Sequence, residues 1–315
     1  MTTALAILLA ALSAGGLAYG AHFQHSAVQA LGAQKAQTTP VAQTTQKMRT
    51  APAPEQPQPE PGLRLRRIAA LLRSPRWMIG LGFMGAGTAL NVGALALAPV
   101  MVVQPVGALS LIISVLLGVY VRKVRLPKRV VAAVVICIVG VTAFVTTSAI
   151  KATAQLHLGA EAHPLAWITL AVLVPSTLLV ALVRRPPQLI LIGVAGVLFA
   201  CVATTVHVVA GQLMHSGLGG VSWFNVLTAL GAGLLGSWLV QLAYASGPPE
   251  TVIAGLTVVD PVIAVLLGAL VLGEAAGASL VGLGLMCLFG AAACGGVIVL
   301  ANYHPDVRVR TAARR

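Results

Sequence analysis

The chain has 315 residues, of which 58% are hydrophobic and only 9% charged, and its formal net charge is +13. This composition excludes a soluble globular domain, and unbroken apolar runs of about twenty residues exclude a barrel of short alternating strands. The basic residues lie almost wholly between the apolar runs and in the tail, which is typical of membrane topology and argues against nucleic-acid binding. The sequence therefore predicts an all-α polytopic membrane protein, because helices satisfy their own backbone inside a bilayer.

The first apolar run, Thr3–Tyr19, predicts an uncleaved membrane span within residues 1–24. A signal peptide would carry a basic n-region, whereas the first lysine is Lys35. Residues 25–76 then form a predicted cytoplasmic loop rich in Gln, Thr, Pro and Ala, which cannot bury enough apolar surface to fold. Its last part, Leu63–Trp77, is either a basic amphipathic helix on the membrane surface or a charged flank of the next span.

Eight further apolar runs bring the total to nine predicted spans. They are Trp77–Leu97, Met101–Val121, Val130–Ala149, Leu165–Val183, Leu189–Gln212, Trp223–Ser246, Thr251–Leu272 and Ala278–Ala301. The basic loop Arg122–Arg129 and the basic tail 302–315 fall on the same side of the membrane when the nine spans alternate. Because basic loops stay inside, we expect a multi-pass protein of the cytoplasmic membrane with its N-terminus outside and its C-terminus in the cytoplasm.

A shift of 150 positions aligns the second half of the chain with the first. The shift places Ala264–Gly268 on Ser114–Gly118. The same shift places Cys287–Gly290 on Cys137–Gly140. By the charge rule the two copies cross the membrane in opposite directions, and such inverted repeats are typical of secondary transporters. The predicted repeats are residues 77–149 and 165–301.

The segment Gly247–Glu274 contains the strongest candidate for a functional side chain. Asp260 is a carboxylate in the middle of this apolar segment, and Pro261 follows it directly. A carboxylate at membrane depth is costly and by default marks a solute pathway or a proton relay, while the proline predicts a helix break. We therefore expect Asp260 to line a translocation site, and the alternative is that it only caps a half-helix beginning at Pro261.

Polar residues in other spans are weaker candidates for the same site. Gln104 precedes Pro105, so it either unwinds the entrance of a helix and contacts the solute or marks the first turn of a span. The remaining candidates, which could instead hydrogen-bond between helices, are Asn91, Gln241, Ser110, Ser114 and His207. Glu250 suits the helix dipole at the start of its helix and could join Asp260 at a divalent cation. Glu274 is expected to be solvated near the outer end.

The remaining motifs argue against catalysis and against a cofactor. The four cysteines lie in predicted spans and are expected to be small buried packing residues: Cys137, Cys201, Cys287 and Cys294. Gly80–Gly85 and Gly231–Gly236 fit G-x-G-x-x-G, but both lie inside spans, so close helix packing explains them better than a dinucleotide. The sequence contains no Walker loop and no catalytic constellation, so we expect neither an enzyme nor a cofactor.

Two segments resemble a known transporter superfamily. Leu90–Gly118, LNVGALALAPVMVVQPVGALSLIISVLLG, resembles the branch of the drug/metabolite transporter superfamily that includes the NIPA magnesium transporters. Gly247–Glu274 is similar to the proline-containing helix and terminal Gly-Glu of the wider superfamily. The superfamily's common plan has ten helices, whereas nine are predicted here, as in the NIPA branch. Asp260 also stands where no acid is expected in the magnesium carriers.

The leading expectation is an alternating-access carrier for a small metabolite or amino acid, coupled to protons. The alternative that the resemblance implies is a carrier of magnesium or another divalent cation. A non-transporting scaffold or regulator that uses the basic loop is the hypothesis from a different class. The expected partners are the lipid bilayer and a small solute or ion, without nucleic acid, and a homodimer is left open.

Overall fold

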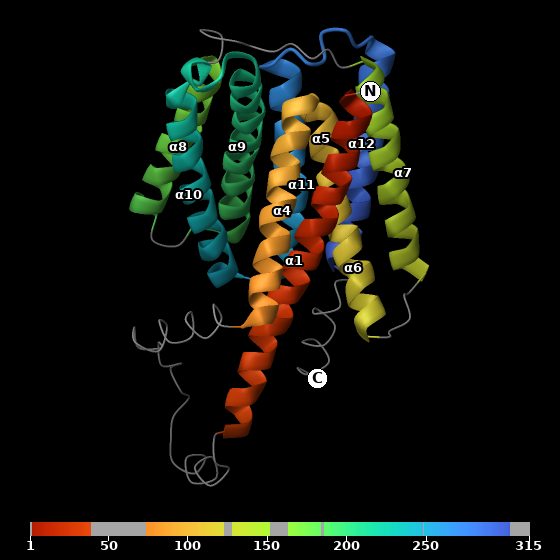
Figure 1. Ribbon diagram of the computed structural model, residues 1–315, viewed down its shortest axis with the longest axis vertical. Coiled ribbons are helices and arrows are strands. Elements are labelled where there is room, and N and C mark those ends of the chain that lie inside the picture. The colour runs from red at the N-terminus through yellow and green to blue at the C-terminus, as the bar shows by residue number, and fades with distance from the viewer. Residues whose placement is uncertain are drawn as a thin grey trace. The chain divides into compact units, whose positions relative to one another are not determined.

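The computed structural model describes residues 2–38, 74–122, 128–151, 163–183, 186–247 and 249–302. Every regular element in these ranges is a helix (Figure 1). The helices are α1 (Thr2–Thr38), α4 (Pro75–Leu97), α5 (Val100–Gly107), α6 (Leu109–Arg122), α7 (Lys128–Lys151), α8 (His163–Leu182), α9 (Gln188–Ser216), the 3-10 turn η3 (Leu218–Gly220), α10 (Trp223–Ser246), α11 (Pro249–Leu270) and α12 (Leu280–Asn302). Within the described ranges nine spans are long and apolar enough to cross a membrane, with α5 and α6 forming one of them. The prediction of an all-α polytopic membrane protein is therefore confirmed.

The first helix is longer than the sequence predicts. Helix α1 continues to Thr38, although the expected loop begins at residue 25. The extra segment is rich in Ala and Gln and contains no proline before Pro40, so nothing in it stops a helix. Most of the predicted loop, with the greater part of Leu63–Trp77, lies outside the described residues.

The described residues fall into two compact units. The smaller unit, Gly16–Ala86, contains the second part of α1 and the first part of α4. In this unit the rings of Phe23 and Phe83 stack with their centroids 5.9 Å apart. The larger unit contains the first residues of α1 and everything from Gly87 onward, and it holds all of the candidate site residues.

Helices α7 and α12 of the larger unit pack side by side in opposite directions (Figure 1). A Cβ added at Gly140 would lie 2.8 Å from the backbone N of Ala293, and one added at Gly296 would lie 2.9 Å from the carbonyl O of Ala133. Residue numbers therefore rise along α7 as they fall along α12, so the two helices are antiparallel. The crossing lies near Gly140 and Gly290, which the 150-residue shift pairs, so this geometry fits an inverted repeat.

Both proline-containing segments are more regular than the sequence predicts. Helix α11 is continuous through Asp260 and Pro261, so the predicted break at Pro261 is wrong. A proline removes one backbone donor, and membrane helices tolerate that loss when neighbouring groups compensate. In the first half of the chain, Gln104 and Pro105 lie inside α5, so the predicted unwinding at Gln104 is not seen either. Ala108, between α5 and α6, keeps a right-handed helical backbone (φ −61°, ψ −21°), and the two helices form one span.

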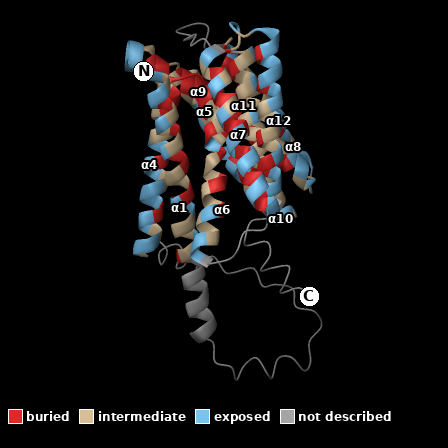
Figure 2. Cartoon of the chain, turned by 90° about the vertical axis from the view of Figure 1, so that its right-hand side faces the viewer, coloured by how far each residue is buried: buried red, intermediate tan, exposed pale blue. Residues whose placement is uncertain are grey.

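Several helices carry exposed residues along their length (Figure 2), and many of these residues are large and apolar. On α7 these side chains recur at Val131, Val135 and Val139. On α10 they recur at Leu227 and Leu234. Spacing of about one or two helical turns places such residues on one face, and an apolar face of this kind suits contact with lipid.

Candidate functional site

The carboxylate of Glu274 accepts a hydrogen bond on each of its two oxygens. This residue follows α11, at a turn where Gly273 adopts the left-handed conformation with φ 67°. The backbone N–H of Glu274 donates to the carbonyl O of Gly268 at 3.0 Å, which folds the chain back against the helix. The residue is only 1% exposed, so the expectation that Glu274 is solvated is wrong.

The start of α5 explains why a carboxylate is needed here. Pro99, two residues after the end of α4, occupies the N-cap position of α5, but a proline has no side-chain oxygen to cap a helix. The N–H groups of Val102 and Val103 reach the carbonyl O of Pro99. The first two amides of the helix, on Val100 and Met101, are left without a backbone partner, as at every helix N-terminus.

Glu274 satisfies both of these amides with one carboxylate. Its Oε1 accepts from the N–H of Val100 at 2.7 Å, and its Oε2 accepts from the N–H of Met101 at 2.9 Å. The positive end of the α5 dipole favours this negative charge. The arrangement therefore joins the end of α11 to the start of α5, and so joins the two predicted repeats.

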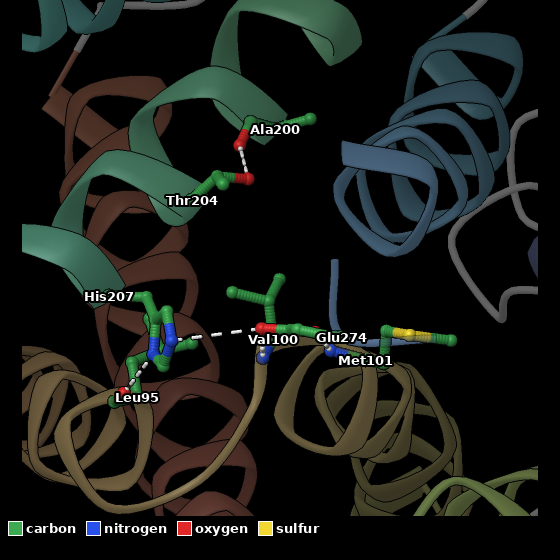
Figure 3. A network of polar contacts seen from close by, with 7 residues as sticks. All are labelled: Leu95, Val100, Met101, Ala200, Thr204, His207 and Glu274. Atoms are coloured by element: carbon green, nitrogen blue, oxygen red, sulfur yellow. Dashed lines mark hydrogen bonds and ion pairs between the residues drawn. The ribbon is translucent and has the colours of Figure 1, made fainter. Parts of the chain in front are cut away.

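His207 of α9 completes the cluster (Figure 3). Its Nδ1 hydrogen-bonds to the carbonyl O of Leu95 in α4, and its Nε2 lies 3.7 Å from Oε1 of Glu274. The imidazole is 7% exposed and lies between α4 and the Glu274 carboxylate. Thr204, one turn earlier on α9, donates to Ala200 of its own helix at 2.8 Å and takes no part. We call Glu274, His207 and the groups they bond the α5 cap cluster.

Asp260 lies in a different environment on the same helix. Its Oδ1 is buried and has no hydrogen-bond partner within the described residues. Ala264 and Leu267, which follow on the same side of α11, pack in the main core cluster of the larger unit. A Cβ added at Gly196 of α9 would lie 3.4 Å from the backbone N of Asp260, so the two helices approach closely at this level. Asp260 is thus a half-buried residue with one unsatisfied buried oxygen, Oδ1, on the α11 helix where α9 approaches it.

The other sequence candidates are dispersed. Asn91, Gln104, Ser110 and Ser114 are all half-buried, and Gln241 is exposed on α10. The hydroxyl of Ser110 donates to the carbonyl O of Gly107 at 2.7 Å, at the junction of α5 and α6. The side chain of Glu250 lies outside the described residues. Whether any of these side chains touches a solute stays a prediction.

The cysteines follow the packing prediction only in part. Cys137 and Cys201 are buried, and Cys294 is half-buried. Cys287 is exposed on α12, so the expectation of burial is wrong at this position. No group of three or more His, Cys, Asp or Glu side chains in the described part of the chain is arranged to hold a metal ion.

Sequence reasoning missed Glu274 because its role depends on a residue far along the chain. The capped amides belong to residues 173 and 174 positions earlier, a separation that no local pattern reveals. Two signals were nevertheless present. Pro99 predicts an uncapped helix start, and the Gly-Glu pair at Gly273 and Glu274 marks a carboxylate beside a turn.

Comparison with known proteins supports the resemblance. Residues 66–198 match the family "Magnesium transporter NIPA". The chain is 32% identical to Magnesium transporter NIPA4 of Mus musculus over 119 residues, which are 37% of this chain and 29% of that protein. It is 44% identical to Probable magnesium transporter NIPA6 of Arabidopsis thaliana over 69 residues, 22% of this chain and 21% of that protein.

A longer alignment joins the chain to a bacterial protein without a described function. An uncharacterized protein of Corynebacterium glutamicum is 27% identical over 225 residues, which are 67% of this chain and 74% of that protein. No solved structure matches the chain. The alignments to the named magnesium transporters cover less than a third of those proteins.

The family match covers α4 to the first part of α9 and leaves out His207, Asp260 and Glu274. The relatives with a described function are named as transporters, which points away from an enzyme. The chain is a multi-pass membrane protein that resembles the NIPA-like branch of the drug/metabolite transporter superfamily, as Leu90–Gly118 predicts.

Proposed function

We propose that the chain is a secondary transporter that moves a divalent cation such as Mg²⁺ across the cytoplasmic membrane by alternating access. The observation that carries this proposal is Asp260, a carboxylate whose Oδ1 is buried without a partner in the middle of α11. Such a group is costly in a membrane unless it meets a cation or a proton during its working cycle. The names of the relatives favour the cation over the metabolite of our first expectation.

One carboxylate is enough for this cation. Mg²⁺ dehydrates reluctantly and usually keeps several waters, so proteins hold it through one or two carboxylates. The lack of a larger ligand cluster among the described residues therefore fits a partly hydrated Mg²⁺.

The two predicted repeats, residues 77–149 and 165–301, would supply the motion. The antiparallel packing of α7 on α12 supports an inverted relation between them. In this mechanism the repeats rock about the level of Asp260 and expose it first to one side and then to the other. The basic loops and tail would stay in the cytoplasm, with the N-terminus outside.

Reconstitution into proteoliposomes tests the proposal. The purified protein should raise the initial rate of Mg²⁺ entry, reported by a trapped fluorescent indicator, above that of protein-free liposomes. A panel of radiolabelled amino acids and metabolites is measured in parallel. Uptake of one of these without Mg²⁺ entry would support our first expectation, and uptake of nothing would support a scaffold or regulator.

A further inference from the structure

We propose that His207 and Glu274 together bind one proton, and that this proton ties α9 to the junction of α11 and α5 and so closes this end of the carrier. The role of the proton in a carrier rests on the proposed transport function. The binding of the proton rests only on the geometry of the α5 cap cluster. All of its groups belong to the larger unit.

The tautomer of His207 follows from its partner on α4. A carbonyl oxygen can only accept, so Nδ1 must carry the hydrogen that is shared with Leu95. A neutral imidazole then has a lone pair and no hydrogen at Nε2. This lone pair faces Oε1 of Glu274 across 3.7 Å. Two acceptors therefore face one another, and the contact lacks one proton.

The addition of one proton makes the contact attractive. The proton converts His207 to an imidazolium beside the carboxylate, and a buried charge of either sign is stable only when it is paired. Glu274 keeps its two bonds to Val100 and Met101 in both states, so the start of α5 stays capped. What changes is the contact between His207 of α9 and the Glu274 carboxylate. Gain of the proton closes this contact, and loss of the proton loosens it.

Backbone groups of two neighbouring helices contact the pair. Helix α4 contributes the carbonyl of Leu95, and α5 contributes the amides of Val100 and Met101. His215 lies two turns further along α9 and bonds the carbonyl O of Gly211 in its own helix at 3.0 Å. His215 is therefore a matched control for the loss of one histidine from the same helix.

Hydrogen exchange of the full chain in lipid nanodiscs reads the contact directly. After correction for intrinsic rates, peptides covering residues 93–104 and 204–210 should be about tenfold more protected near pH 6 than near pH 8. His207→Gln should abolish the pH dependence. Glu274→Gln should abolish it too, because a neutral amide carries no charge to pair with an imidazolium. His215→Gln should retain it. Equal protection of the unmodified protein at both pH values, or loss of the pH dependence in His215→Gln, would overturn the proposal.

A second measurement covers the case in which the variants fail to insert. Nitrogen-15 NMR of the unmodified protein with labelled histidine should show an imidazole with hydrogen on Nδ1 near pH 8 and a doubly protonated ring near pH 6. A ring with hydrogen on Nε2 at the higher pH would contradict the proposal. Neither readout requires transport. Protection that depends on pH, in a protein that takes up no Mg²⁺, would support the proton site and overturn only the proposed function.

Discussion

Asp260 and Glu274 are two carboxylates of the same segment, fourteen positions apart, in opposite circumstances. Glu274 is almost fully buried and accepts two backbone hydrogen bonds, whereas Oδ1 of Asp260 is buried with no partner among the described residues. A buried carboxylate that is hydrogen-bonded stabilises the fold, whereas a buried carboxylate oxygen without a partner destabilises it. Such an oxygen is therefore a candidate for a functional role. The pair therefore separates a structural carboxylate from a candidate transport carboxylate, and substitutions at each should give opposite results.

Glu274→Ala should have the largest effect on stability. The substitution leaves the N–H groups of Val100 and Met101 buried without an acceptor, at a cost of about 3 kcal/mol. Thermal unfolding of the purified protein in detergent measures this loss. Glu161→Ala, which removes a carboxylate outside the described residues, is the control. Equal unfolding temperatures for the two variants would mean that Glu274 does not cap α5.

Asp260→Asn should give the reverse pattern. Loss of the charge should lower Mg²⁺ uptake at least about tenfold, because the cation loses its carboxylate ligand. The unfolding temperature should be unchanged or higher, since a neutral amide is less costly than a carboxylate whose buried Oδ1 has no partner among the described residues. Asp306→Asn in the tail is the matched control. Full transport by a correctly inserted Asp260→Asn protein would remove Asp260 from the mechanism.

Gly268→Ala tests how tightly the Glu274 carboxylate is held. A Cβ at this position would lie 2.5 Å from Oε2 of Glu274 and 3.4 Å from Cγ of Met101. The carboxylate must then shift off the α5 amides, at an expected cost of about 2 kcal/mol in the free energy of unfolding. Gly193→Ala on α9, where nothing lies within 4 Å, should be neutral or slightly stabilising. Similar results for both variants would show that the carboxylate is free to move.

Pro261→Ala should have a small, stabilising effect. The substitution restores a backbone donor inside a helix that is already continuous, so the protein should become about 1 kcal/mol more stable. Pro175→Ala makes the same change inside α8 and should stabilise to a similar extent. Only Pro261→Ala should also slow Mg²⁺ uptake, because it stiffens α11 beside Asp260. Equal uptake by the two variants would separate the proline from the transport step.

The sequence predicted the membrane architecture because the bilayer imposes strong local rules. Span positions follow from apolar length, and the structure places nine spans in the described residues close to the predicted bounds. The end of α1 was wrong because an Ala- and Gln-rich segment has no signal that separates a helix from a polar loop. The prediction of a break at Pro261 was wrong because a proline removes only one backbone donor. Whether the helix then breaks depends on the groups packed around it.

The candidate site was only partly predictable for a similar reason. An isolated carboxylate such as Asp260 is conspicuous in an apolar run. Glu274 stands at the end of its run, where an acid is ordinary, and its burial depends on the uncapped start of a distant helix. His207 was recognised as a buried interhelical residue, but the direction of its two nitrogens depends on Leu95 and Glu274, which lie in different helices.

The distance along the chain between Glu274 and the amides that it caps has a consequence for biosynthesis. Val100 precedes its carboxylate by 174 positions, so α5 leaves the ribosome and enters the bilayer long before its acceptor has been translated. Until the segment after α11 arrives, two backbone donors at the head of α5 must be sheltered by water at the membrane surface or by the insertion machinery. A ribosome that stalls before this segment would therefore leave a nascent chain in which α5 has been inserted but the two amides at its start have no acceptor.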